Sequence, residues 1–229
     1  MKNFKLISMF LLSICICEIS QAQDWPNFNR YRDDNTRIGL PKPGESRVVF
    51  MGNSITDGWI NAFPEYFSDN NYIDRGISGQ TTPQMLVRFR ADVINLKPVV
   101  VTILAGTNDI AGNTGPSTLE MITDNIFSMT ELAKSNGIKV ILSSILPVYD
   151  YPWKPGLYPA EKIVKLNEMI KKYADSHGIL YLDYYSSMVD SRKGMKTEYS
   201  EDGVHPNKAG YKVMMDLCSQ AIKKVLSNK

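Results

Sequence analysis

Three side chains have the types and the spacing of a nucleophilic site. Ser54 lies in the stretch VVFMGNSITDGW, residues 48–59, where apolar residues run directly into a short polar turn. Asp202 and His205 lie close together in a loop that also contains glycine and proline. A carboxylate so close to an imidazole can hold it in one tautomer and stabilise it once it is protonated. A general base beside a serine needs this support, so the three residues indicate serine-based acyl transfer.

Each of these residues also has a structural interpretation. Ser54 or Thr56 could cap the helix that follows the apolar run, as serine and threonine often do. Acidic residues before histidines are common in loops, so the pairing of Asp202 with His205 is a weak motif by itself. The functional interpretation rests on the combination.

Two further stretches carry groups suited to stabilising a developing negative charge. The segment GISGQTTP, residues 76–83, contains Gly79, whose backbone N–H could approach a ligand closely or belong to an ordinary turn. The segment AGTND, residues 105–109, contains Asn108, whose side-chain amide could donate to an oxyanion. Asparagine and aspartate are also common turn formers, so both interpretations stand at this point.

A long loop over residues 149–159 is rich in aromatic residues and proline. Long loops that follow a strand are often functional. Tyr151 and Trp153 in this loop are candidate substrate-binding residues, because a rigid aromatic platform suits a sugar or an acyl chain. The alternative is a surface loop whose aromatic side chains fold back onto the core.

These candidates need a scaffold, and the hydrophobic pattern predicts an α/β fold. Five apolar runs alternate with amphipathic segments, which is typical of a three-layer α/β/α sandwich around a mostly parallel five-stranded sheet. The candidates follow expected strands, and ligands bind at the carboxyl edge of such sheets. The expected strands cover residues 48–51, 72–74, 99–104, 139–146 and 179–182. The expected helices cover residues 57–67, from 82 onward, 117–136 with a capping box at Ser117 and Glu120, 160–176 and 208–226.

Residues 1–22 are expected to form a secretory signal peptide. Two lysines precede an apolar run over residues 6–16, and the small residues of SQA close the segment. The run is too short for a membrane span, and isoleucine before each of its cysteines argues against a lipoprotein anchor. We therefore expect a secreted or periplasmic protein without an integral membrane segment in the mature chain. An arm over residues 23–46 would lead into one domain over residues 47–229.

Composition excludes several classes of function. The 26 basic and 24 acidic residues are nearly balanced and form no basic block, so no nucleic-acid partner is expected. Cys218 is the one cysteine outside the signal segment, which leaves no internal disulfide and predicts a small core residue. The chain has only two histidines, and His177 fits a structural role at a helix end. The sequence therefore contains no set of histidine and cysteine ligands for zinc. Phosphate-binding and dinucleotide motifs are absent, and we expect neither metal nor cofactor.

The order of the segments resembles the SGNH, or GDSL-type, hydrolase family. An α/β-hydrolase would need a GxSxG elbow well inside the chain, and GNSIT at residues 52–56 does not provide one. Four separated blocks carry the resemblance: GNSIT, GISGQTT, GTND and DGVHP. It extends from about Arg47 over nearly all of the mature chain, and it implies the flavodoxin-like fold of that family.

The resemblance also implies roles for the residues that match its blocks. Ser54 would be the nucleophile, His205 the base and Asp202 the residue that orients the base. The backbone N–H groups of Ser54 and Gly79 would form the oxyanion hole with the side chain of Asn108. An acyl-enzyme would form and be hydrolysed by water, without a metal or cofactor.

Two positions depart from the pattern of the family. Asn53 replaces the aspartate usual before the nucleophile, and Asp74 stands where asparagine is more familiar. Neither belongs to the implied triad or oxyanion hole, so they concern the subfamily more than activity. The second and third blocks are similar to the branch of the platelet-activating-factor acetylhydrolase catalytic subunits and of secreted bacterial acetylesterases. This similarity implies a short acyl group, most plausibly acetyl.

The sequence therefore predicts a secreted serine esterase that acts on a small-molecule or oligosaccharide ester. A lysophospholipase or thioesterase is the second enzyme hypothesis, and it would need a wide apolar groove that Asp150 and Lys154 do not offer. A carbohydrate-binding protein without turnover is the third, although it would not need the complete set of Ser54, Asp202 and His205. The oligomeric state is not predicted.

Overall fold

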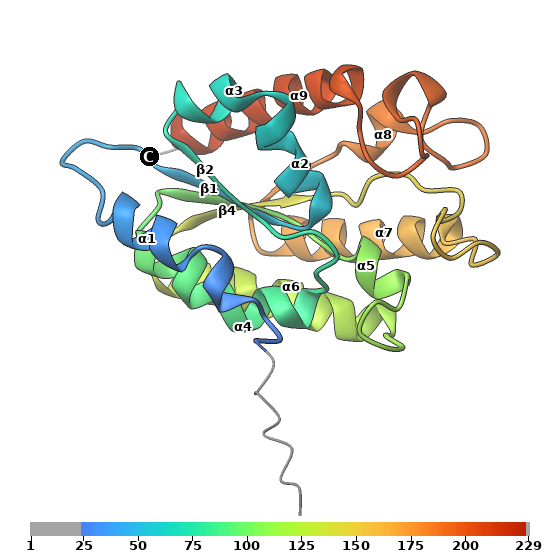
Figure 1. Ribbon diagram of the computed structural model, residues 1–229, viewed down its shortest axis with the longest axis horizontal. Helices are drawn as coiled ribbons and strands as arrows, with labels where there is room; N and C mark the ends of the chain where they lie inside the picture. Colours follow the sequence, from blue (N-terminus) through green and yellow to red (C-terminus); the bar gives the residue numbers. More distant parts are fainter. Residues whose placement is uncertain (1–23, 228–229) are drawn as a thin grey trace, which may run out of the picture.

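Five parallel strands form the centre of the structure, a computed structural model that describes residues 24–227 (Figure 1). The strand order is β2-β1-β3-β4-β5, and every pairing is parallel. The register places Val48 of β1 opposite Tyr72 of β2 and Val100 of β3. The strands are β1 (Val48–Gly52), β2 (Tyr72–Gly76), β3 (Val100–Leu104), β4 (Lys139–Ser143) and β5 (Leu180–Leu182). The three-layer sandwich with a five-stranded sheet is confirmed, and the sheet is entirely parallel.

Helices cover both faces of the sheet, which explains why the central strands are continuous apolar runs (Figure 1). All residues of β1 and β3 are buried. One face packs on α4 (Thr82–Asp92), α6 (Leu119–Ser135) and α7 (Ala160–Ser176), and the other on α2 (Ser54–Ala62), α3 (Pro64–Ser68), α8 (Tyr185–Met188) and α9 (Lys208–Ser227). The remaining short helices are η1 (Phe28–Arg30), α1 (Arg32–Ile38), η2 (Ile94–Leu96), α5 (Thr107–Ile110) and η3 (Thr197–Tyr199).

The fourth strand is shorter than predicted. It leaves the sheet after Ser143, although the apolar run continues to Leu146. The reason is a side chain from α7, because Asn167 accepts a hydrogen bond from the N–H of Ile145 at 2.8 Å and donates one to its carbonyl at 3.0 Å. These two bonds take the backbone groups that would otherwise extend the ladder.

The helix after the first strand begins earlier than predicted, and this changes the position of the candidate nucleophile. α2 starts at Ser54, with Asn53 as its N-cap, and the side chain of Asn53 accepts from the N–H of Ile55 at 3.1 Å. The prediction that Ser54 or Thr56 caps this helix is therefore wrong. The helix also ends at Ala62, because the residue before Pro64 is pushed out of the helical region and a new helix, α3, begins there.

The predicted capping box is also misplaced. Thr118, and not Ser117, is the N-cap of α6, and its hydroxyl accepts from the N–H of Met121 at 3.2 Å. A capping box is present earlier in the chain, where Thr81 and Gln84 bond reciprocally at the start of α4. The S/T-x-x-E/Q pattern thus predicted a capping box, but at the wrong helix.

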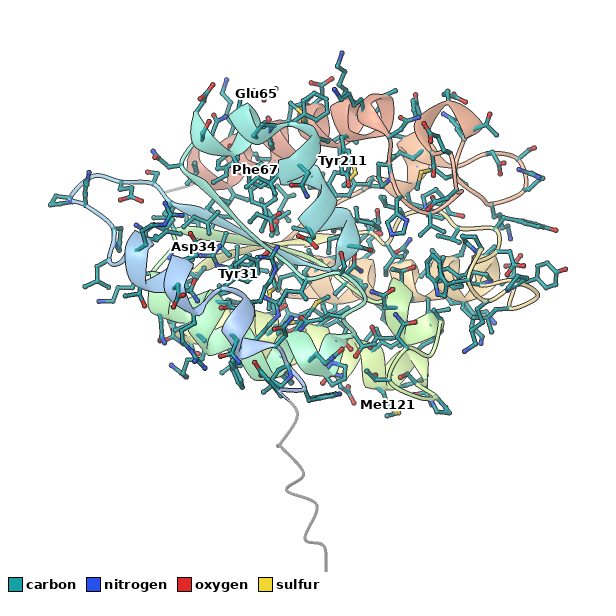
Figure 2. All side chains as sticks on the ribbon, in the orientation of Figure 1. Tyr31, Asp34, Glu65, Phe67, Met121 and Tyr211 are labelled. Atoms are coloured by element: carbon teal, nitrogen blue, oxygen red, sulfur yellow. The ribbon has the colours of Figure 1, made fainter. Side chains whose placement is uncertain are left out.

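The arm that precedes β1 contains two short helices, η1 and α1. It packs at the β2 edge of the sheet, where Figure 2 labels Tyr31 and Asp34. The Tyr31 side chain is buried, and its hydroxyl bonds to the carboxylate of Asp74 and to the carbonyl of Gly76. Asp34 pairs with the guanidinium of Arg75 at 2.8 Å. Tyr31 therefore anchors the arm on the body of the protein.

Asp74 is the buried carboxylate beneath this arm. One of its oxygens accepts from the N–H of Gly76 at 2.8 Å, and the other has no partner among residues 24–227. Burial, the largest effect, raises the pKa of Asp74 to about 7. The carboxyl therefore binds its proton more tightly in the folded than in the unfolded protein.

We expect Asp74→Asn to flatten the dependence of stability on pH. The stabilisation from protonated Asp74 is complete below its unfolded pKa and is lost as the pH rises through about 7. Relative to the parent, the free energy of unfolding of the variant should rise by roughly 2–3 kcal/mol between about pH 5 and about pH 8. Urea unfolding of both proteins at the two pH values measures this. A difference between the two proteins that does not change with pH would contradict it.

Two further sequence predictions concern the lone cysteine outside the signal segment and the membrane-spanning character of the chain. Cys218, on the inward face of α9, is fully buried in the core as predicted, and burial raises its pKa to about 11. The predicted signal peptide lies outside the described residues. Within residues 24–227, no helix combines the length and the apolar character that crossing a membrane requires.

Candidate active site

Ser54 and His205 meet at the carboxyl edge of the sheet. Ser54 is the first residue of α2, directly after β1, and His205 lies in the loop that precedes α9. The Ser54 Oγ and the His205 Nε2 are 2.9 Å apart, although 151 residues separate them in the sequence. At this distance the imidazole can accept the hydroxyl proton directly.

Asp202 holds the other side of the imidazole. Its Oδ2 lies 2.7 Å from His205 Nδ1, while its Oδ1 accepts from the backbone N–H groups of Val204 at 2.9 Å and His205 at 2.8 Å. The hydroxyl of Ser200 donates to the same Oδ1 at 3.1 Å. One carboxylate oxygen is thus used to shape the loop, and the other faces the ring.

These contacts keep Asp202 ionised. Burial is the largest single effect and raises its pKa, but the hydrogen bonds from the His205 side chain and from the backbone N–H groups of His205 and Val204 together outweigh it. The resulting pKa of Asp202 is about 2. A carboxylate beside Nδ1 fixes the tautomer that leaves Nε2 free to accept a proton, and it stabilises the imidazolium once formed.

Three further groups are candidate donors to an oxyanion: the N–H groups of Ser54 and Gly79 and the side-chain amide of Asn108. The N–H of Ser54 is at the first position of α2, where no intrahelical acceptor exists. Gly79 has a φ of +79°, which an L side chain rarely adopts, and its N–H bonds to no other described residue. Asn108 donates one amide hydrogen to the carbonyl of Gln80 at 2.9 Å, which leaves the second hydrogen for a ligand.

Buried polar contacts fix the segments that carry these donors. The carboxylate of Asp109 accepts from the N–H of Thr82 at 3.0 Å and from its hydroxyl at 2.6 Å, which joins the third block to the second. Burial, the largest effect, raises the pKa of Asp109 to about 6 in spite of these bonds. A Cβ on Gly76 would lie 2.2 Å from the backbone nitrogen of Asp57, so glycine is required where β2 approaches the first turn of α2.

Arg88 is a structural residue of the site that the sequence analysis missed. Its guanidinium is fully buried and pairs with Asp92 at 2.9 Å. It also donates to the carbonyl of Gly52 at 3.2 Å, to the carbonyl of Arg75 at 2.8 Å and to the side chain of Gln80 at 2.6 Å. Arg88 therefore ties the ends of β1 and β2 to the loop of Gly79. The spacing of Arg88 and Asp92, one helical turn apart, was the available signal.

The N-terminal arm also reaches the loop that contains Gly79. Arg30 of the arm lies 3.4 Å from the carboxylate of Asp57, which accepts from the hydroxyl of Ser78 at 2.7 Å. The amide of Gln80 donates to the carbonyl of Pro26 at 2.7 Å. The arm over residues 23–46 therefore contributes contacts next to the candidate site.

The aromatic loop places Trp153 beside His205. The centroids of their rings are 6.0 Å apart, and Trp153 is 46% exposed. Asp150 organises the loop, because its carboxylate accepts from the backbone N–H groups of four loop residues: Tyr151, Gly156, Leu157 and Tyr158. The platform is therefore held in shape by one short side chain, as aspartate does in turns.

Tyr151 does not face the site. It has no exposed surface, and its hydroxyl bonds to the hydroxyl and the carbonyl of Thr107, each at 2.9 Å. This burial contradicts the prediction that Tyr151 contacts a substrate directly. Its ring instead supports that of Trp153, with centroids 5.0 Å apart. The physical reason is that the Tyr151 hydroxyl finds both of its partners on the buried Thr107, so this side chain points inward.

The structure thus joins Ser54, His205 and Asp202 in one chain of contacts, and it joins Asn108 to the loop of Gly79 through the carbonyl of Gln80. Within residues 24–227, no group of three histidine, cysteine or acidic side chains is arranged to bind a metal ion. A hydroxyl, an imidazole and a carboxylate in contact with one another can perform acyl transfer through a covalent intermediate. The fold and this set of groups are those of an acylhydrolase.

The chain belongs to the GDSL-like lipase/acylhydrolase family, whose sequence profile matches residues 50–213. This places it among the carboxylic ester hydrolases. It is similar to the crystal structure of a GDSL-like lipase from Bacteroides thetaiotaomicron VPI-5482, with 48% identity and a TM-score of 0.86 over 88% of this chain and 99% of that one.

Curated relatives are more distant. An acetylxylan esterase from Xylanibacter ruminicola is 26% identical over 222 residues, which cover 81% of this chain and 45% of the relative. A lipoprotein from Bacillus subtilis is 28% identical over 162 residues, which cover 69% of this chain and 63% of the relative. The chain thus spans less than two thirds of the length of both relatives.

Proposed function

We propose that the protein is a secreted serine esterase that removes short acyl groups, chiefly acetyl, from a carbohydrate. The observation that carries the catalytic part is the continuous chain of contacts from Ser54 through His205 to Asp202, with distances of 2.9 Å and 2.7 Å. Export from the cytoplasm is proposed from the sequence pattern of residues 1–22.

Ser54 is the nucleophile in this proposal. Its Oγ attacks the ester carbonyl carbon while the hydroxyl proton moves to Nε2 of His205. The carbonyl oxygen becomes an oxyanion, which accepts hydrogen bonds from the N–H groups of Ser54 and Gly79 and from the amide of Asn108. Asp202 stabilises the imidazolium that has formed.

The same residues complete the reaction. The imidazolium of His205 gives its proton to the oxygen of the leaving alcohol, and the ester bond to that oxygen breaks. A water molecule then attacks the acyl group on Ser54, with His205 again taking and returning one proton. The acid leaves, and the Ser54 hydroxyl is restored.

The surface around Ser54 supports a short acyl group on a sugar. Trp153 offers an exposed aromatic face beside the imidazole, and such faces suit the apolar side of a sugar ring. The relative from Xylanibacter ruminicola is an acetylxylan esterase. A lysophospholipase or thioesterase needs an apolar groove, whereas charged and amide side chains line the recess beside Ser54.

Hydrolysis of p-nitrophenyl acetate, butyrate and octanoate, beside release of acetate from acetylated xylooligosaccharides, tests this function. We expect kcat/KM on the nitrophenyl esters to be highest for acetate, and acetate to be released from the oligosaccharide. Each missing methylene in a pocket changes specificity by roughly 10–200-fold, so a clear maximum is measurable. Activity confined to octanoate, or none on acetylated sugar, would refute the proposal in favour of a lipid substrate or a binding protein.

A further inference from the structure

We propose that a polar recess between α2 and α9 binds the alcohol part of the substrate, and that this part is polyhydroxylated. The inference rests on the proposed function and adds residues to it: Asp57, Asn61 and Lys208. The recess has a volume of about 590 Å³, and Ser54 and His205 lie in its wall. It is therefore continuous with the candidate active site.

The helical repeat explains why α2 carries a polar stripe that begins at the nucleophile. Ser54, Asp57 and Asn61 follow at intervals of three and four residues and so share one face of the helix. The opposite face, with Ile55 and Trp59, is buried in the core. With a rise of 1.5 Å per residue, the stripe extends about 10 Å from Ser54. An acetyl group is much shorter, so most of the stripe is left for another part of the substrate.

The recess lies on the side where the alcohol must leave. The leaving oxygen receives its proton from His205, so the alcohol must lie next to that imidazole. The residues that follow His205 in the chain, through Lys208, form one wall of the recess. The floor contains Tyr211, whose hydroxyl donates to the carbonyl of Ile55 at 2.9 Å and which lies between the two helices (Figure 2).

Two side chains of the recess have hydrogen-bonding capacity that the protein does not use. Asn61 donates to the carbonyl of Asp57 at 3.0 Å, while its own side-chain oxygen has no partner among residues 24–227. Lys208 forms no ion pair or hydrogen bond within the same residues. It is also the first residue of a helix of 20 residues, where a cation is unfavourable to the helix dipole. The amine of Lys208 is thus available to a ligand, and its charge does not stabilise the helix.

The adjoining surface allows more than one sugar residue to bind. Asp57 and Asn61 also line a second cavity of about 750 Å³, which extends to Arg30 of the arm. The carboxylate of Asp57 can accept hydrogen bonds from hydroxyl groups. The side chain of Asn61 can both accept and donate hydrogen bonds, and the amine of Lys208 can donate them. This set of groups suits the hydroxyl groups of an oligosaccharide better than an alkyl chain.

The test compares two substrates that share the acetyl group and differ in the alcohol. Acetylated xylooligosaccharide has hydroxyl groups that reach the recess, and p-nitrophenyl acetate has none. The ratio of kcat/KM for the two substrates is measured for the parent, Asn61→Ala and Lys208→Ala. We expect the ratio to fall about tenfold in each variant, as for the loss of one polar contact in a binding site. Lys223→Ala, at the far end of α9, is the matched control and should leave the ratio unchanged.

The outcomes separate this inference from the proposed function. A parent protein that releases no acetate from the oligosaccharide would refute the proposed function. A parent that releases acetate, with both variants retaining the parent ratio, would overturn the recess assignment alone. Both substitutions preserve the helices, because alanine favours helix interiors and Lys208→Ala removes an unfavourable charge. Thermal unfolding of each variant checks that the fold is kept.

Discussion

Ser54→Ala is expected to lower kcat for p-nitrophenyl acetate by roughly 10⁴–10⁶-fold, the largest effect of any single substitution in this protein. The change removes the oxygen that we propose forms the acyl-enzyme, while the N–H of residue 54 stays in place as a proposed oxyanion donor. Residual catalysis over the reaction in water should therefore remain, from the donors of Gly79 and Asn108. Steady-state kinetics and a burst-phase experiment measure the loss of turnover and of the covalent intermediate.

The stability of the Ser54→Ala protein serves as the control. The hydroxyl of Ser54 bonds to His205 at the surface of the site, and Asn53 remains the N-cap of α2. We therefore expect circular dichroism and the melting temperature to stay close to those of the parent. A folded variant that hydrolyses the ester at the parent rate would show that Ser54 is not the nucleophile.

Asp202→Asn is expected to lower kcat by roughly 10³–10⁴-fold without unfolding the loop. The Oδ1 of asparagine can still accept from the N–H groups of Val204 and His205, which hold the loop in the parent. The amide NH₂ then replaces Oδ2, 2.7 Å from Nδ1 of His205. Two donors cannot face each other there, so Nδ1 must become the acceptor and the proton must move to Nε2. A protonated Nε2 cannot accept the proton of Ser54.

Glu201→Gln is the matched control for this substitution, because it removes the neighbouring exposed carboxylate and leaves Asp202 in place. We expect kcat within about twofold of the parent for that variant. Equal losses in both variants would mean that charge in the loop, and not the tautomer of His205, supports the reaction. An Asp202→Asn protein with parent activity would refute the role of Asp202.

The residues of the candidate site were easier to predict from the sequence than the residues that hold them in place. Ser54, Gly79 and Asn108 follow apolar runs, and parallel strands bring their carboxyl ends to one edge, so the topology alone places them together. Asp202 and His205 were predictable from their spacing in one loop. All of these signals are local in the chain, or follow from the rules that govern parallel sheets.

The parts that could not be predicted depend on contacts between distant segments. Arg88 is buried among backbone carbonyls of two strands, which no pattern in its own helix reveals beyond its spacing from Asp92. Tyr151 and Trp153 have similar composition signals, but only the path of the loop decides which is exposed. The start of α2 was misplaced because Asn53, Ser54 and Thr56 are all favoured N-cap residues, and only the path of the chain decides that Asn53 is the cap.

The long separation of Ser54 and His205 in the sequence has a consequence for folding. The bond between them closes a segment of 151 residues that includes four of the five strands. Contacts of such high sequence separation form late, because the entropy of the intervening chain opposes them until the sheet is assembled. Helices such as α7 can form long before that stage. The return of esterase activity during refolding therefore reports when the last long-range contact has formed. The return of helix content does not report that step.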